Sequence, residues 1–154
     1  MSMNSGQYDE NTFTLVVNAM ELSDYVFLIT DNPNKFPEYT VTKKKKDDMI
    51  IITMQLRQDS LTNIVRRQAF EIYMNVFGAN EINVNRHPER KQERLNKQLY
   101  AIELCNRHLA AIQLCRKRFH LNYKRIKYWG GKTRDLRETI ERWHESDKDR
   151  YKDI

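Results

Sequence analysis

The chain has 154 residues, of which 40% are apolar and 31% are charged, a balance typical of one domain of ordinary size. It has only four glycines and three prolines, too few for the frequent turns of an all-β sandwich or barrel. We find no apolar run near the ~20 residues of a membrane span and no secretory signal. We therefore expect a single domain over residues 1–154 that makes no contact with a membrane.

The charge is distributed unevenly along the chain. Residues 1–80 carry 8 Lys or Arg and 10 Asp or Glu, whereas residues 81–154 carry 19 and 11, for net charges of −2 and +8. A basic half of this kind favours a polyanionic partner. The two cysteines, Cys105 and Cys115, fall in one predicted helix about 15 Å apart, too far for a disulfide. Cysteines that form no disulfide are typical of a protein in the reducing cytoplasm.

Apolar residues at helical spacing predict two helices in the first half of the chain. The first covers residues 13–30 and ends at the breaker cluster 31–34. The second covers about residues 47–79, with Asp47 and Asp48 suited to its N-terminus. Its β-branched run Ile50–Ile52 favours a strand when taken alone, but no turn signal separates it from the helical pattern that follows, so we predict helix throughout.

Two more helices are predicted in the second half. Pro88 opens one that continues to about residue 119, and the other covers about residues 122–147, with a kink or short break at Gly130-Gly131. The charged tail, residues 146–154, is predicted to fray. Four amphipathic helices joined by short links predict an all-α fold, an antiparallel up-down four-helix bundle with its core over about residues 13–147.

Motifs that carry catalysis are lacking in the sequence. The four histidines show no metal-ligand spacing, and Glu141 with His144 supplies only one of the two Glu-x-x-His pairs of a bundle di-iron site. There is no Walker loop, dinucleotide-binding fingerprint or nucleophile elbow. We therefore predict a protein that is not an enzyme and that uses no metal or other cofactor.

The most informative stretch is Arg116–Arg134, which contains eight Lys or Arg, four aromatic residues and no acid. Such cations neutralise phosphates, and aromatic faces stack on unpaired bases. Trp129 lies on the core stripe and is therefore predicted to pack inside, and a merely solvated face is the alternative for the charges. The predicted nucleic-acid-binding residues are Arg116, Lys117, Arg118, Lys124, Arg125, Lys127, Lys132 and Arg134.

Two other basic groups stand apart from this stretch. One is the run Lys43–Lys46, whose contact with nucleic acid the sequence leaves open. The other opens the third helix and consists of Arg86, Arg90, Lys91, Arg94 and Lys97. In an antiparallel bundle these two groups lie at opposite ends of the second helix, so they cannot form one patch.

A series of short motifs resembles the four-helix-bundle family typified by Avd, the accessory variability determinant of diversity-generating retroelements. The resemblance covers about residues 19–147. In chain order its motifs are Lys35-Phe36-Pro37, Phe77-Gly78-Ala79-Asn80, Arg90 with Arg94, Leu109-Ala110-Ala111-Ile112, Tyr128-Trp129 and Ile140-Glu141-Arg142-Trp143. The insertion at residues 41–48 and the glycine pair at 130–131 depart from compact members of the family.

The resemblance implies an accessory protein of a retroelement. Such proteins assemble as a barrel-like homopentamer with a basic surface, and bind a separate reverse transcriptase together with its template RNA and cDNA. This chain has no Tyr-x-Asp-Asp polymerase motif of its own. The alternatives are a protein of the type encoded in intervening sequences of 23S rRNA genes, which belongs to the same superfamily, and a plain protein–protein adaptor.

Overall fold

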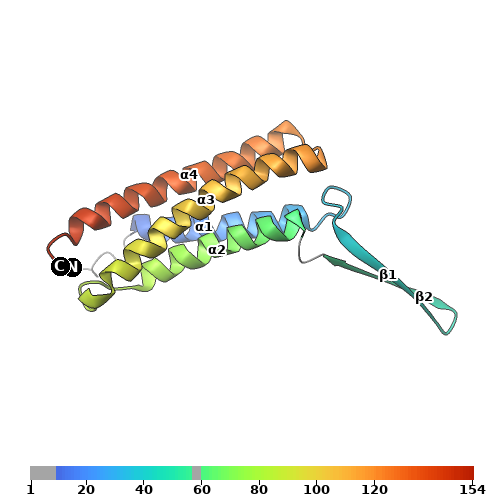
Figure 1. Cartoon of the computed structure of the whole chain (residues 1–154), viewed down its shortest axis with the longest axis horizontal. Coiled ribbons are helices and arrows are strands. Elements are labelled where there is room, and N and C mark those ends of the chain that lie inside the picture. Colours follow the sequence, from blue (N-terminus) through green and yellow to red (C-terminus); the bar gives the residue numbers. More distant parts are fainter. Residues whose placement is uncertain (1–9, 57–59) are drawn as a thin grey trace.

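A computed structural model describes residues 10–56 and 60–154, and side chains within 13–38, 42–53 and 60–154. Four long helices lie side by side, and a β-hairpin projects from one end of them (Figure 1). The elements in chain order are α1 (Glu10–Thr30), β1 (Tyr39–Lys46), β2 (Met49–Leu56), α2 (Leu61–Glu81), the 3₁₀ turn η1 (Pro88–Arg90), α3 (Lys91–Phe119) and α4 (Tyr123–Arg150).

The helices pack through the apolar stripes that the sequence predicted. Each helix contacts its neighbour in sequence, and α1 also contacts α4. The predicted stripe of α2 is buried from Leu61 to Val76, and that of α4 from Ile126 to Trp143. In α3, helical spacing predicts an apolar stripe of Leu95, Leu99, Ile102, Cys105, Leu109 and Ile112. The prediction was wrong for Leu99, which is 49% exposed, while the polar Gln98 is buried and hydrogen-bonded.

The prediction of helix over residues 47–56 was wrong, and with it the strictly all-α class. Lys43–Lys46 of β1 pair in antiparallel register with Met49–Ile52 of β2, forming a two-stranded sheet. Asp47 and Asp48, at φ 51° and 62°, form the two-residue turn between the strands. Left-handed dihedrals at both positions match the twist of a hairpin, and Asp tolerates them better than most residues. The β-branched run therefore follows its strand propensity.

Helix α2 begins only after the hairpin. The Ser60 side chain caps it by accepting a hydrogen bond from the backbone N–H of Asn63 (3.0 Å). Before the hairpin, the Glu38 carboxylate accepts hydrogen bonds from the backbone N–H (2.8 Å) and the hydroxyl (3.0 Å) of Thr62. Glu38 therefore ties the chain just before β1 to the start of α2.

The structure corrects two further expectations about α4, a break at the glycine pair and a frayed tail. The helix continues without a break through Gly130 and Gly131, since burial of the flanking residues outweighs the low helix propensity of glycine. The tail does not fray at residue 146, because Asp147 is fully buried and Tyr151 is 1% exposed. The ion pair of Asp147 with Arg94 and the packing of Tyr151 with Ile82 and Val84 hold this end of the chain.

Helix α1 contains a longer apolar stretch than the sequence analysis expected. Within the described residues, Phe13–Thr30 forms one 18-residue window of mean hydropathy 1.3, enough by length and composition to cross a membrane. That is weak evidence for a span, because core helices pass the same test. In this structure Leu15, Leu22 and Val26 of the window are buried against the other helices.

Candidate nucleic-acid interface

The predicted basic stretch lies where α3 ends and α4 begins. His120 terminates α3 in the left-handed region at φ 54°, and Asn122 caps α4 by accepting a hydrogen bond from the backbone N–H of Arg125 (2.9 Å). Leu121 between them is buried. Because the chain reverses within three residues, the cations of the last turn of α3 come close to those of the first turn of α4.

All eight predicted positions reach the surface, with Arg125 and Lys132 half-buried and the others exposed. Two of the eight are paired: Arg118 lies 3.5 Å from the Glu38 carboxylate, and Lys132 lies 3.7 Å from that of Glu21. The other six have no carboxylate within 4 Å in the described part of the chain; they are Arg116, Lys117, Lys124, Arg125, Lys127 and Arg134.

The two groups of cations relate differently to the helices that carry them. Those at the end of α3 lie at a helix C-terminus, where a positive charge stabilises the helix. Those at the start of α4, Lys124, Arg125 and Lys127, lie at a helix N-terminus, whose first turn contains no acid. There the helix dipole opposes positive charge. Helix stability therefore does not account for the α4 group, whereas a bound anion would offset the repulsion.

A hollow of about 540 Å³ lies on the surface over this part of α4. Three of its lining side chains are ammonium groups and one is a carboxylate. No atom lies within 4 Å of the position that a Cβ of Gly131 would occupy, so this residue leaves the hollow open. The lining residues are Lys124, Lys127, Tyr128, Gly131, Lys132 and Asp135.

Exposed tyrosines lie among these cations. Tyr123 is 64% exposed and Tyr128 is 56% exposed. The Nζ atom of Lys127 lies 6.0 Å from the centre of the Tyr123 ring, and that of Lys132 lies 5.8 Å from the Tyr128 ring, which also packs on Tyr25 of α1 at 5.0 Å. The arrangement offers aromatic faces beside positive charge, a combination suited to unpaired bases and their phosphates.

Trp129 does not belong to this surface. The prediction that it packs inside is confirmed, since it is fully buried and its indole N–H donates a hydrogen bond to Nε2 of His108 (3.0 Å). Phe119 is only partly buried and packs on Phe36 at a ring separation of 5.1 Å. The aromatic part of the interface is therefore carried by the two tyrosines.

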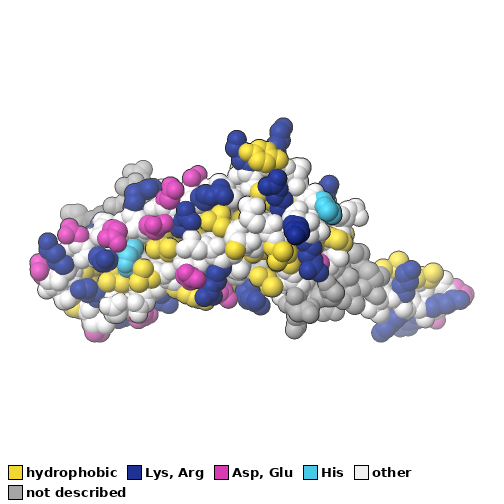
Figure 2. All heavy atoms as spheres, turned by 45° about the horizontal axis from the view of Figure 1, so that its top comes forward, with side chains coloured by type: hydrophobic (Ala, Val, Ile, Leu, Met, Phe, Trp, Pro, Cys, Tyr) yellow, Lys and Arg dark blue, Asp and Glu magenta, His cyan; other side chains and the backbone are white. Residues whose placement is uncertain are grey.

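The hairpin rises from the same end of the molecule. Phe36 and Glu38, just before β1, contact Phe119 and Arg118 at the end of α3. The hairpin and the α3–α4 connection accordingly lie at one end of the helices in Figure 1. On the face shown in Figure 2, Lys and Arg side chains lie along the whole length of the helices, whereas most Asp and Glu side chains of the helices lie toward the other end. We call residues 116–134 the basic end; the lysine run Lys43–Lys46 lies near the tip of the hairpin that projects from the same end of the helices.

Sequence reasoning missed the hairpin that carries the lysine run out from the same end of the helices as residues 116–134. It treated residues 47–56 as helix and so did not foresee a projecting arm. The signal that could have found the arm is the pair Asp47-Asp48 between two eight-residue segments, the second of them β-branched, which is typical of a hairpin.

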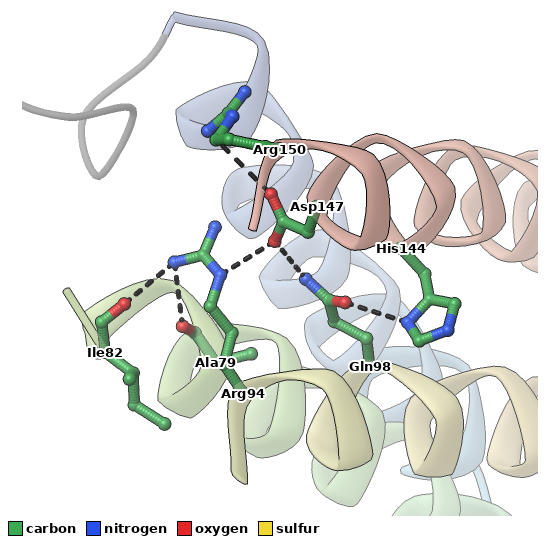
Figure 3. A network of polar contacts seen from close by, with 7 residues as sticks. All are labelled: Ala79, Ile82, Arg94, Gln98, His144, Asp147 and Arg150. Atoms are coloured by element: carbon green, nitrogen blue, oxygen red, sulfur yellow. Dashed lines mark hydrogen bonds and ion pairs between the residues drawn. The ribbon is translucent and has the colours of Figure 1, made fainter. Parts of the chain in front are cut away.

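Two cations of the cluster that opens α3, Arg94 and Arg90, are neutralised within the fold. The Arg94 guanidinium is buried, donates to the Asp147 carboxylate (2.7 Å) and to the carbonyl of Ile82 (2.9 Å), and lies over Trp143. Gln98 donates to the same carboxylate (2.7 Å), as Figure 3 shows. At the surface, Arg90 is paired with Glu93 (2.8 Å). Arg94 therefore joins α3 to α4, and neither it nor Arg90 is free for a polyanion. Arg86 and Lys97 have no carboxylate within 4 Å among the described residues.

The described residues offer little for covalent or metal chemistry. Among them, no group of three or more His, Cys, Asp or Glu could hold a metal ion. Cys105 and Cys115 are buried and free, and burial raises the pKa of each thiol to about 12, which keeps both in the unreactive thiol form. His144 is bound to Gln98 through Nδ1 (3.0 Å). The cations of residues 116–134, in contrast, are suited to binding phosphates.

No protein-family model matches the chain, and no curated protein or solved structure is significantly similar to it. The class that the fold and the site define is a mostly helical protein of four packed helices with a basic end. Its membership of the Avd family stays a prediction from the short motifs.

Proposed function

We propose that this chain is a cytoplasmic, non-catalytic accessory subunit of a diversity-generating retroelement. In this proposal the basic end binds the template RNA and the cDNA, and another face binds the separate reverse transcriptase, so that the subunit supports mutagenic copying of the template. The observation that carries the nucleic-acid part is the group Lys124, Arg125 and Lys127, three surface cations without acidic partners among the described residues at a helix N-terminus.

The mode of binding follows from the kinds of side chain at the basic end. The ammonium and guanidinium groups contact phosphates, and Tyr123 and Tyr128 stack on bases that are not paired. Contacts to the backbone and stacking depend little on sequence. We therefore propose that this surface binds single-stranded or looped nucleic acid with little preference for sequence.

We further propose that the four helices form an antiparallel up-down bundle and that several copies assemble, five of them by the resemblance. The contact between α1 and α4, the first and last helices, is consistent with such a closed bundle. An oligomer repeats the basic end in every copy, so that weak contacts per chain add up through avidity.

A protein-binding face is supported by exposed apolar residues on α1 and α2. Phe70, Met74 and Phe77 follow one another at helical spacing along α2, each between 41% and 47% exposed. The Arg66 guanidinium, one turn before Phe70, lies 5.4 Å from the ring of Phe27 on α1, which is also exposed. We assign this face to the polymerase or to a neighbouring copy. The same face favours a plain protein–protein adaptor as the second candidate function.

The first experiment compares two double charge reversals by titrating single-stranded RNA in a filter-binding assay. Lys124→Glu with Lys127→Glu changes the basic end, and Lys148→Glu with Lys152→Glu changes net charge equally at the far end of α4. We expect at least a tenfold loss of affinity in the first variant and a small change in the second, because only the first removes the proposed phosphate contacts. Equal losses in both variants would contradict the proposal.

A second experiment separates the retroelement subunit from the adaptor. The chain is co-expressed with any reverse transcriptase encoded beside it and recovered with and without nuclease. We expect a complex that contains RNA and loses mass on nuclease treatment. A protein complex that nuclease leaves unchanged, from a chain that binds no RNA alone, would support the adaptor.

A further inference from the structure

The outer edge of strand β2 is the most unusual surface of the molecule. Its described side chains Met49, Ile50, Ile51 and Ile52 are 66%, 69%, 45% and 58% exposed. In the described part of the chain, β1 is the only strand that pairs with β2, so the other edge of β2 presents unpaired backbone N–H and C=O groups. A two-stranded hairpin of this kind is marginally stable by itself in water.

The sequence of β2 is that of an internal strand. Side chains alternate between the two faces of a strand, so four apolar residues in succession place apolar side chains on both faces. Such continuous runs are typical of strands that are covered on both sides, whereas half-exposed strands alternate apolar with polar residues. In the isolated chain β2 is therefore an edge strand whose composition is suited to the middle of a sheet.

The sequence of β1 has the opposite character. The register places Lys43 opposite Ile52 and Lys45 opposite Ile50 on one face, and Lys44 opposite Ile51 on the other. Both faces of the hairpin are consequently divided into a basic β1 side and an apolar β2 side. Lysine along an edge strand prevents pairing with another strand. One edge of the hairpin is thus protected by charge, and the other is not.

Charge also decides which edges of two hairpins could meet. Pairing through β1 would bring two lysine strands within about 5 Å of one another, which is strongly repulsive. Pairing through β2 would keep the two β1 strands three strand spacings apart, about 14 Å. That distance exceeds the Debye length of about 8 Å at physiological salt, so the repulsion is largely screened. A second β2 strand is moreover apolar on both faces, and so matches the side chains it would meet.

We propose that β2 pairs with β2 of a second copy of this chain, making a continuous antiparallel sheet in the order β1-β2-β2-β1. The contact is two-fold symmetric, as expected for a self-complementary strand. The Ile side chains of the two central strands then cover one another, with the lysine stems alongside them. The assembly contains an even number of chains, whatever the number joined through the helices.

The first test measures the mass of nuclease-treated protein by light scattering after gel filtration. Ile51→Lys puts a charge in the middle of the proposed contact, and Leu99→Lys makes the matched change at a 49% exposed site on α3, outside the proposed protein-binding face of α1 and α2. We expect Ile51→Lys to halve the mass of the wild-type assembly and Leu99→Lys to leave it unchanged. Far-UV circular dichroism checks that the helices persist in both variants.

The second test uses cross-linking and does not depend on a disruptive change. Ile51→Cys and Lys44→Cys place a thiol at the same level of the hairpin on β2 and on β1 respectively. A reagent that spans about 8 Å should link two copies through position 51 and fail to do so through position 44, because the proposed sheet separates the β1 strands by about 14 Å. The native Cys105 and Cys115 are buried and serve as the unmodified background.

The results that overturn the proposal are equally specific. A wild-type mass that Ile51→Lys leaves unchanged excludes pairing through β2, as does equal cross-linking at positions 44 and 51. If the hairpin serves only to bind nucleic acid, Ile51→Lys should leave the mass unchanged, and Lys44→Cys, which removes a cation, should lower the affinity for RNA. Because mass and cross-linking are read on nuclease-treated protein, they stand independently of the proposed RNA binding.

Discussion

His108 shows how a polar residue is accommodated in the core. It is fully buried, Nε2 accepts a hydrogen bond from Trp129, and Nδ1 lies 3.0 Å from the Gln68 side-chain oxygen. An acceptor at Nε2 leaves the proton on Nδ1, so the ring is neutral and donates to Gln68. Burial lowers the pKa of His108 to about 3. The residue therefore links helices α2, α3 and α4 only in its neutral form.

This environment predicts a pH dependence of stability. In the unfolded chain a histidine titrates near pH 6.5, so below that pH the unfolded state binds a proton that folded His108 refuses. The free energy of unfolding should fall as the pH drops from about 6.5 toward 3, by up to about 1.4 kcal/mol per pH unit from this residue. Urea unfolding between pH 7 and 4 should show a shallower fall in His108→Gln. Parallel curves would contradict the assignment.

A second prediction at this scale concerns the buried ion pair of Arg94 and Asp147. Removing one partner of such a pair leaves an uncompensated buried charge, which typically costs about 3–5 kcal/mol. We expect Asp147→Ala to destabilise the protein by about that amount in urea unfolding. Asp149 lies two residues after Asp147 and forms an exposed pair with Lys152. Asp149→Ala should therefore cost less than about 1 kcal/mol. Similar losses in the two variants would show that the buried pair contributes no more to the free energy of unfolding than the exposed pair does.

At the scale of elements, the hairpin turn combines two left-handed residues without a glycine. Asp48 at φ 62° adopts a conformation that glycine reaches without steric cost, and Asp-Gly is a favoured pair in this kind of turn. We expect Asp48→Gly to stabilise the hairpin by about 1 kcal/mol. Slower hydrogen exchange at the amides of β1 and β2, with unchanged exchange in α2 and α3, is the measurement. Faster exchange in the hairpin would contradict the turn geometry.

The elements also show where local patterns misled. Asp47-Asp48 precedes an apolar run, as a helix N-terminus would, yet the backbone turns back there and pairs Lys46 with Met49. Helix α4 contains two adjacent glycines but remains straight enough to bury Trp129 on one side of them and Leu136 on the other. In the hairpin, strand propensity and pairing within residues 39–56 outweighed the signal for a helix N-terminus. In α4, packing against the other helices outweighed a local preference of a few kcal/mol.

For the whole molecule, the separation of charge predicts how binding depends on salt. Each phosphate neutralised on a single strand contributes about −0.7 to the slope of log affinity against log salt concentration. Six cations of the basic end without acidic partners among the described residues therefore predict a slope of up to about −4 per chain. A titration of RNA at several salt concentrations measures it, and Lys124→Glu with Lys127→Glu should make the slope shallower. A slope near zero would contradict phosphate binding.

The sequence by itself determined most of the helical frame and its core. Periodic apolar residues require one buried face, so they predict helices and core positions such as Val65 and Ile140 without knowledge of the partner helix. The basic stretch 116–134 was equally visible, because nothing acidic interrupts it. The burial of Trp129 followed from its place on the stripe.

Only the tertiary structure decided which charges are free. Arg94 and Arg125 are both arginines near the start of a helix. Asp147, 53 residues from Arg94, neutralises Arg94 within the core, while no described carboxylate pairs with Arg125. Likewise the lysine run projects from the same end of the molecule as residues 116–134 only because residues 39–56 form a hairpin and Glu38 at its base contacts the end of α3. Contacts between residues distant in sequence set both outcomes, and local spacing carries no information about them.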